Sequence, residues 1–205
     1  MNWSERLRWR EKVHGRYHDL WKLKLVRKRL PLSLGYLKDG ERVLEIGASN
    51  RELEKRIKDR FPRAVYKSLD IDPTYPHDYP SFDEIQEPFD LVFLFEVIEH
   101  LSLEEGMEMV ARIYQILNPG GRVILTTPNV YTPGQYWKDA THLVAYHYEE
   151  LGGLFLSQDF EIVEIRRIFR KSFIGFALKG YLFSPLFRFL GIDFSESILL
   201  VARKP

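Results

Sequence analysis

The feature that most constrains the fold is an apolar run at residues 90–95, Asp-Leu-Val-Phe-Leu-Phe. A strand without polar and apolar alternation is typical of the middle of a parallel sheet, where helices cover both faces. Further strands are expected at 42–46, 65–70, 122–127, 160–167 and 198–202, and helices at 9–30, 51–60, 103–117 and 148–157. This alternation predicts an α/β fold with an open, mostly parallel sheet and helices on both faces.

Ligands of such sheets bind beyond the carboxyl ends of the strands, so the residues that follow each strand are the first candidates. Gly47 follows the strand at 42–46, where the chain turns sharply into a helix that a capping box at 49–52 would start. A dinucleotide site would need two further glycines, but Ser49 and Glu52 occupy those positions, which argues against NAD and FAD. Asp70, at the end of the second strand, is placed to accept hydrogen bonds from two ribose hydroxyls.

Four segments, at 43–49, 69–73, 89–101 and 117–129, resemble the motifs of class I S-adenosylmethionine-dependent methyltransferases. They read Val-Leu-Glu-Ile-Gly-Ala-Ser, Leu-Asp-Ile-Asp-Pro, a run ending in Glu-Val-Ile-Glu-His-Leu, and a run containing Asn-Pro-Gly-Gly. The resemblance covers about residues 40–165, and within the family the chain resembles small, single-domain O-methyltransferases of the ubiquinone pathway. It implies a Rossmann-like sheet of about seven strands with an antiparallel last strand, and S-adenosylmethionine as the cofactor. The cofactor-binding residues that it implies are Glu45, Gly47, Ala48, Ser49, Asn50, Asp70, Ile71, Phe95 and Glu96.

The sequence departs from the family pattern at two places. Ser49 and Arg51 stand where the cofactor turn usually has glycines. The stretch 71–89 is also short, and Asp78 and Asp83 are the candidates for the acidic residue that contacts adenine.

The stretch Glu96-Val-Ile-Glu99-His100 follows the buried strand and is expected to place three polar side chains on one side of the site. Similar stretches bind metal in small-RNA 2′-O-methyltransferases and in ubiquinone-pathway enzymes, with His142 or His147 as a further ligand here. We expect instead that His100 and His142 are catalytic, acting as bases, and assign no metal ligand, although a divalent metal is an alternative. Tyr131, Tyr136 and Trp137 are expected in an acceptor-side loop.

The charge is unevenly distributed. The net charge of +1 argues against DNA as a partner, but residues 1–30 hold ten Lys and Arg against three Asp and Glu, with three of the four tryptophans. Residues 1–35 are therefore expected to form a basic, aromatic lid helix over a core at 40–170, within one domain at 1–205. The apolar stretch 172–192, with five Phe and two charged residues, is expected to be a lid or dimer contact, or a segment at a membrane surface.

The sequence thus predicts a methyltransferase that transfers a methyl group to an oxygen atom of a small or lipid-like acceptor. The alternatives are an RNA methyltransferase that uses the basic arm, and a non-catalytic binding protein on the same fold. The charged start and the absence of cysteine predict a cytoplasmic location, with peripheral contact to a membrane as a variant.

Overall fold

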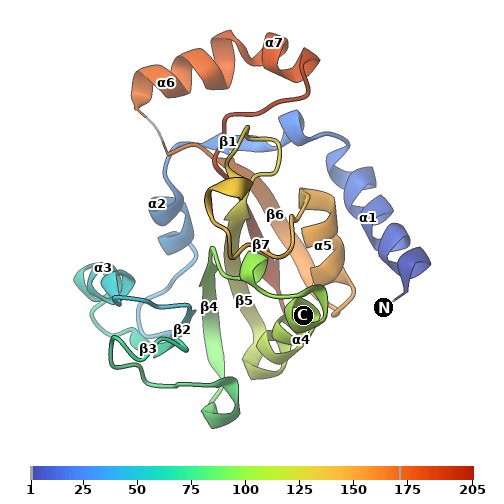
Figure 1. The fold of residues 1–205 in the computed structure, drawn as a ribbon. Helices are drawn as coiled ribbons and strands as arrows, with labels where there is room; N and C mark the ends of the chain where they lie inside the picture. Colours follow the sequence, from blue (N-terminus) through green and yellow to red (C-terminus); the bar gives the residue numbers. More distant parts are fainter. Residues whose placement is uncertain (1, 171) are drawn as a thin grey trace.

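The computed structural model describes residues 2–170 and 172–205, and a seven-stranded sheet forms its centre (Figure 1). The strand order is β1 (Lys24–Val26), β6 (Glu161–Ile168), β7 (Ser197–Arg203), β5 (Leu117–Pro128), β4 (Phe89–Phe95), β2 (Arg42–Ile46) and β3 (Val65–Leu69). All neighbouring pairs are parallel except those of β7, which is antiparallel to β5 and β6. The predicted α/β fold with an antiparallel last strand is confirmed.

Helices cover both faces of this sheet. α1 (Trp3–Tyr17), α4 (Leu103–Ile116) and α5 (Tyr148–Leu156) lie on one face, and α2 (Arg29–Leu34) and α3 (Glu52–Arg60) on the other. Residues 91–94 of β4 have no exposed surface and alternate between the two cores, which explains why the apolar run has no polar face. Short 3₁₀ turns occur at Leu20–Lys22, Phe82–Glu84, Ile98–His100 and Tyr136–Lys138.

The expected helix at 9–30 is wrong beyond residue 17. α1 ends at Tyr17, and His18 takes a positive φ of 59° that a continuing helix does not allow. The following Lys-Leu-Lys-Leu alternation has the period of a strand, and it forms β1, which pairs with β6. α1 packs against α5 rather than over the carboxyl edge of the sheet, so it is α2 that reaches the cofactor turn.

The expected capping box at 49–52 is also wrong. α3 begins at Glu52, whose N–H donates to Oδ1 of Asn50 (3.1 Å), and the side chain of Ser49 does not cap the helix. The stretch 71–89 has little regular structure, as expected, with one isolated bridge between Leu69 and Tyr79.

The apolar stretch connects β6 to β7 as three consecutive helical pieces: α6 (Phe173–Ala177), a π-helical turn at Leu178–Leu182, and α7 (Ser184–Phe189). It starts just beyond the carboxyl end of β6 and lies across the top of the molecule in Figure 1. Among the described residues, no helix is long and apolar enough to cross a membrane.

Candidate active site

The turn after β2 is built around Gly47. Its φ is +74°, and its N–H donates to the carbonyl of Leu69 on β3 (2.9 Å). A Cβ at this position would lie 2.4 Å from Cγ2 of Val97, which follows β4. Both the conformation and the close approach of two strand ends therefore require glycine here.

Ser49 and Arg51 keep the shape of a glycine-rich turn although neither is glycine, with φ values of +42° and +56°. Contacts hold these strained residues in place. The N–H of Ser49 donates to Oδ2 of Asp70 (2.7 Å), and the guanidinium of Arg51 pairs with Glu54 (2.9 Å) and Asp78 (3.3 Å). The departures from the family pattern thus change the side chains of the turn but leave its left-handed backbone.

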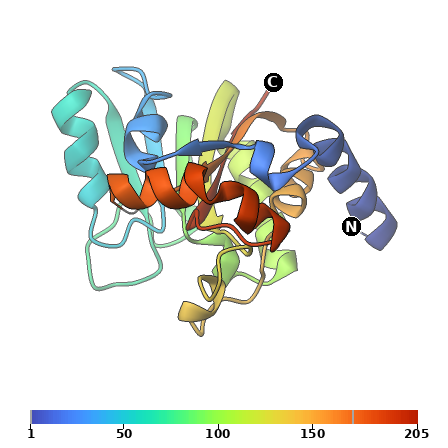
Figure 2. The same ribbon diagram turned by 90° about the horizontal axis from the view of Figure 1, so that it is seen from above.

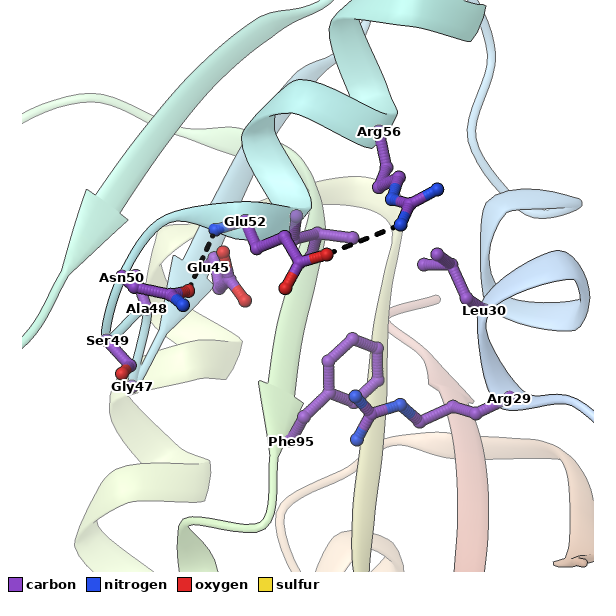
Figure 3. Close-up of a pocket in the computed structure, with 11 residues that line it drawn as sticks. Arg29, Leu30, Glu45, Gly47, Ala48, Ser49, Asn50, Glu52, Arg56 and Phe95 are labelled. Atoms are coloured by element: carbon purple, nitrogen blue, oxygen red, sulfur yellow. Dashed lines mark hydrogen bonds and ion pairs between the residues drawn. The ribbon is translucent and has the colours of Figure 1, made fainter. Parts of the chain in front are cut away.

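A cavity of about 330 Å³ opens beside this turn (Figure 3). Of the expected cofactor-binding residues, the following line it: Glu45, Gly47, Ala48, Ser49, Asn50 and Phe95. Its other lining residues were not expected from the sequence: Arg29, Leu30, Glu52, Leu53 and Arg56. Asp70 and Ile71 lie outside the lining, and the side chain of Ile71 is 88% exposed.

Opposite charges occupy two sides of the cavity. Glu45 is buried and its Oε2 accepts from the hydroxyl of Tyr66 (2.5 Å), while burial raises the pKa of its carboxyl group to about 7. Arg29 lies 4.1 Å over the ring of Phe95 and donates to Oγ1 of Thr126 (3.2 Å); burial lowers the pKa of its guanidinium. Figure 3 shows the guanidinium of Arg29 beside Phe95, across the cavity from Glu45.

Glu96 follows β4 as expected, but it is not among the donor atoms that come together at Glu99, His100 and His142. It takes a positive φ of 55°, and its Oε1 binds Arg170 (2.5 Å) and the hydroxyl of Ser197 (2.9 Å). Glu96 therefore ties the end of β4 to the end of β6 and the start of β7.

A second cluster joins Glu99 and His100 to His142, and its three donor atoms lie within 4.8 Å of one another. The rings of His100 and His142 are 4.7 Å apart. Glu99 has no exposed surface, and neither carboxylate oxygen forms a hydrogen bond to a side chain or backbone group among residues 2–170 and 172–205. Burial, with a smaller contribution from Glu96, raises the pKa of Glu99 to about 8.

The hydrogen bonds of the two histidines determine which nitrogen carries the proton. Nδ1 of His142 lies 2.6 Å from the carbonyl oxygen of Tyr136, which can only accept, so Nδ1 carries the hydrogen. Nδ1 of His100 lies 2.8 Å from Oγ1 of Thr141, whose own hydrogen is donated to Asp139 (2.7 Å). In both neutral rings Nε2 is therefore the basic nitrogen.

The neighbouring loop supplies the remaining candidates. The ring of Tyr136 packs 5.0 Å from that of His142, and Trp137 is 82% exposed. His147 lies outside the cluster, with Nε2 at 3.1 Å from the hydroxyl of Tyr131.

The candidates for adenine contact are engaged elsewhere. Asp78 accepts from the N–H and the hydroxyl of Ser68 and pairs with Lys67 (3.1 Å), and Asp83 pairs with Arg112 (2.7 Å). Neither lines the cavity.

The donors present fit the expected cofactor. S-adenosylmethionine carries a sulfonium, an amino group and a carboxylate at its methionine end, and the cavity offers a buried carboxyl group and a guanidinium on opposite sides. The Asp70 carboxylate accepts two backbone N–H groups, from Ser49 and Asp72, and keeps lone pairs for further donors.

Comparisons with known proteins agree with this geometry. A family model described as a methyltransferase domain matches residues 15–165. A SAM-dependent methyltransferase from Archaeoglobus fulgidus is 17% identical, with 95% of this chain and 94% of that chain covered and a TM-score of 0.69. The complex between the Trm112 methyltransferase activator and the putative methyltransferase of Haloferax volcanii matches at 14% identity, 96% and 93% coverage, and a TM-score of 0.65.

The N-methyltransferase NodS from Bradyrhizobium japonicum WM9, in complex with S-adenosyl-L-homocysteine, matches at 17% identity, 86% and 83% coverage, and a TM-score of 0.58. A search of curated protein sequences gave no match. At these identities the solved structures show the shared fold, while the family model covers most of the chain. The chain belongs to the methyltransferase domain family, and it is a class I methyltransferase that uses S-adenosylmethionine.

Proposed function

We propose that this enzyme methylates an oxygen atom of a small or lipid-like acceptor, and that His142 and His100 take up the acceptor proton. The observation that carries the proposal is the pair of imidazole rings that group with the buried carboxyl group of Glu99, each with Nδ1 engaged and Nε2 left as the basic nitrogen. A hydroxyl group must lose its proton as its oxygen is alkylated, and a neutral imidazole is the side chain best suited to accept it near pH 7.

The cavity residues have the complementary task of orienting the cofactor. Arg29 binds the methionine carboxylate, and Glu45 faces the cationic groups. Asp70 binds the ribose hydroxyls, although in this structure it lies just outside the cavity lining. When bound, the cofactor supplies a methyl group that its sulfonium has already activated, so alignment and the exclusion of water are the main contributions of the protein.

The position of the histidines supports their role at the acceptor side. The N–H groups of Leu143 and Val144 donate to the backbone carbonyl of Glu99 (2.7 and 3.2 Å), which fixes the loop of His142 against the end of β4. Val97, between Glu96 and the cluster, touches the cofactor turn at Gly47. The cofactor turn and the cluster of Glu99, His100 and His142 thus lie on either side of the short segment that follows β4.

The same three groups are a donor set suited to a divalent metal, which would polarise the acceptor hydroxyl. Glu96, which the sequence offered as a further ligand, is held by Arg170 and Ser197 instead. We therefore favour direct proton uptake by histidine, and treatment with a chelator separates the two: a metal mechanism loses activity, and direct uptake does not.

An RNA acceptor has less support from the structure. Much of the basic face of α1 is already paired, since Arg6 binds Glu150 (2.9 Å), Arg10 binds Glu150 (3.0 Å), and Arg16 donates to the carbonyl of Val163 (3.1 Å). Steeply salt-dependent binding of RNA would revive this alternative.

The proposal is tested by transfer of a radiolabelled methyl group to a panel of hydroxyl, amine and RNA acceptors, with His142→Ala, His100→Ala and the control His14→Ala. His14 is an exposed residue of α1 and is not part of the cluster. We expect kcat to fall by about 10²–10⁴-fold in H142A or H100A, while the cofactor Kd from calorimetry stays unchanged. Equal losses of turnover and cofactor affinity would refute the assignment, and cofactor binding without transfer to any acceptor would favour a non-catalytic binding protein.

A further inference from the structure

The helical segment between β6 and β7, residues 172–192, turns large apolar side chains toward solvent. Phe189 is 86% exposed, Ile174 70%, and Phe173 and Leu182 66% each. A surface helix of a globular protein normally turns such residues inward and polar ones outward. Several large exposed apolar side chains on one short segment indicate a site of contact with another molecule or with a membrane.

The inner side of the segment is separately anchored, so the outward residues are not displaced core residues. The ring of Phe176 packs on Phe169 (5.6 Å), and the ring of Phe187 packs on Phe194 (4.7 Å). At Gly180 a Cβ would lie 2.6 Å from Leu25, which shows how closely the segment approaches β1. The segment is therefore held to the body by one side and leaves the other side without a partner among the described residues.

The charge beside this apolar side is positive. Residues 172–192 contain no Asp or Glu, and residues 20–30 contain five Lys and Arg and no Asp or Glu. Lys22, Lys24 and Lys28 are exposed, and Arg27 lies 5.5 Å from the ring of Phe173. Figure 2, seen from above, shows the blue strand β1 running beside the orange and red segment.

We propose that residues 172–192, together with Lys22, Lys24 and Lys28 in and beside β1, dock the enzyme on the surface of an anionic lipid bilayer. The apolar side chains enter the boundary between headgroups and acyl chains, and the lysines contact the negative headgroups. The two signals act together, since either one alone gives weak and reversible binding. The charge complementarity selects a lipid surface over a second copy of the chain, which would bring like charges together.

The docking segment is attached at the same edge of the sheet as the active site. It begins two residues after Arg170, which pairs with Glu96, and it ends one residue before Asp193, whose Oδ2 accepts from Nδ2 of Asn129 just beyond β5. Docking therefore brings the carboxyl ends of β4 and β5 toward the membrane. Such a position favours a lipid-like acceptor. This inference about the acceptor rests on the proposed function, whereas docking on the membrane does not.

Docking is tested with the full chain by sedimentation with two kinds of vesicle. One contains phosphatidylcholine alone, and the other contains about 30 mole per cent of the anionic lipid phosphatidylglycerol as well. We expect binding to the anionic vesicles that weakens as salt rises. Leu182→Ser with Phe189→Ser should lower the partition coefficient by about a hundredfold, and Lys24→Gln with Lys28→Gln by about twenty-five-fold. The matched control is Val65→Ser with Arg60→Gln, which removes one exposed apolar residue and one charge from the region of β3 and α3 and should bind like the wild type.

Circular dichroism and cofactor calorimetry are used to check that each variant is folded, since neither measurement depends on catalytic turnover. Absence of binding to anionic vesicles at low salt would overturn docking and leave the proposed methyl transfer untouched. A wild-type dimer that L182S/F189S converts to a monomer, without vesicle binding, would also overturn it and assign the surface to a second copy. Vesicle binding without methylation of any hydroxyl acceptor would retain docking and refute the proposed function.

Discussion

Replacing Gly47 with Ala tests the central feature of the cofactor turn, namely the contact between two strand ends. An alanine must adopt a φ of +74°, a left-handed conformation that costs about 1–2 kcal/mol for a residue with a Cβ. Its Cβ would also lie 2.4 Å from Cγ2 of Val97, an overlap that costs about 1–3 kcal/mol because Val97 is stiff at χ1. We expect G47A to lower the free energy of unfolding by about 3 kcal/mol.

The steric part of that loss can be separated from the conformational part. Val97→Ala alone should cost about 1 kcal/mol, since it removes two methyl groups from a half-buried position. In the double variant G47A/V97A the overlapping methyl group is gone, and only the cost of the left-handed conformation is added. The double variant should therefore lose about 2.5 kcal/mol rather than the sum of about 4, which gives a coupling energy of about 1.5 kcal/mol.

The assay is urea unfolding of the four proteins, followed by circular dichroism, with cofactor affinity measured by calorimetry on the same samples. Leu156→Ala with Gly15→Ala is a suitable control pair, because a Cβ at Gly15 meets no atom within 4 Å. The two control substitutions should be additive. Additive losses in G47A/V97A would refute the claim that the turn and the end of β4 are in steric contact.

Other predictions concern the charged groups of the site. Arg29→Ala should weaken S-adenosylmethionine binding by about tenfold to a hundredfold in calorimetry, since a charged hydrogen bond is worth about 1.5–3 kcal/mol, and Arg29→Lys should weaken it less; unchanged affinity would exclude Arg29 from the cofactor site. Burial raises the pKa of Glu45 from about 4.5 to about 7, so its contribution to stability is complete below pH 4.5 and is lost as the pH rises through 7. As the pH rises from 4 to 8, the free energy of unfolding of Glu45→Gln should therefore increase relative to that of the wild type by up to about 3 kcal/mol, measured by urea unfolding. Parallel curves of unfolding free energy against pH for the two proteins would contradict this. The same reasoning for Glu99, whose pKa is raised to about 8, predicts that Glu99→Gln is more stable than the wild type at pH 9, and a less stable variant there would be the contrary result.

The parts of the fold that could be predicted from the sequence are those with a local signal. The run at 90–95 has apolar residues on both faces, and α4 begins with a capping box between Ser102 and Glu105. β1 was not predicted because Tyr17, Trp21 and Leu25 are four residues apart, as on one face of a helix, and Leu25 belongs to β1. The pairing with β6, which is distant in sequence, is what makes this segment a strand.

The site was predictable to a similar extent. Glu45 and the turn at 47–50 lie at a strand end and can be found by position alone. Arg29 could not, because it enters the cavity only once α2 is packed on the sheet. The contacts of Glu96 could not be predicted, because its partner Arg170 is far away in sequence and its backbone takes a positive φ.

The position of β7 has a consequence for the synthesis of the protein. This strand is last in the sequence of strands, yet it lies between β5 and β6, and β1 pairs on the other side of β6. Until residues 197–203 have left the ribosome, β5 and β6 cannot be joined through β7, and each of them has an unpaired edge. Completion of the sheet therefore waits for these residues, and until then the two unpaired edges are exposed to pairing with other chains.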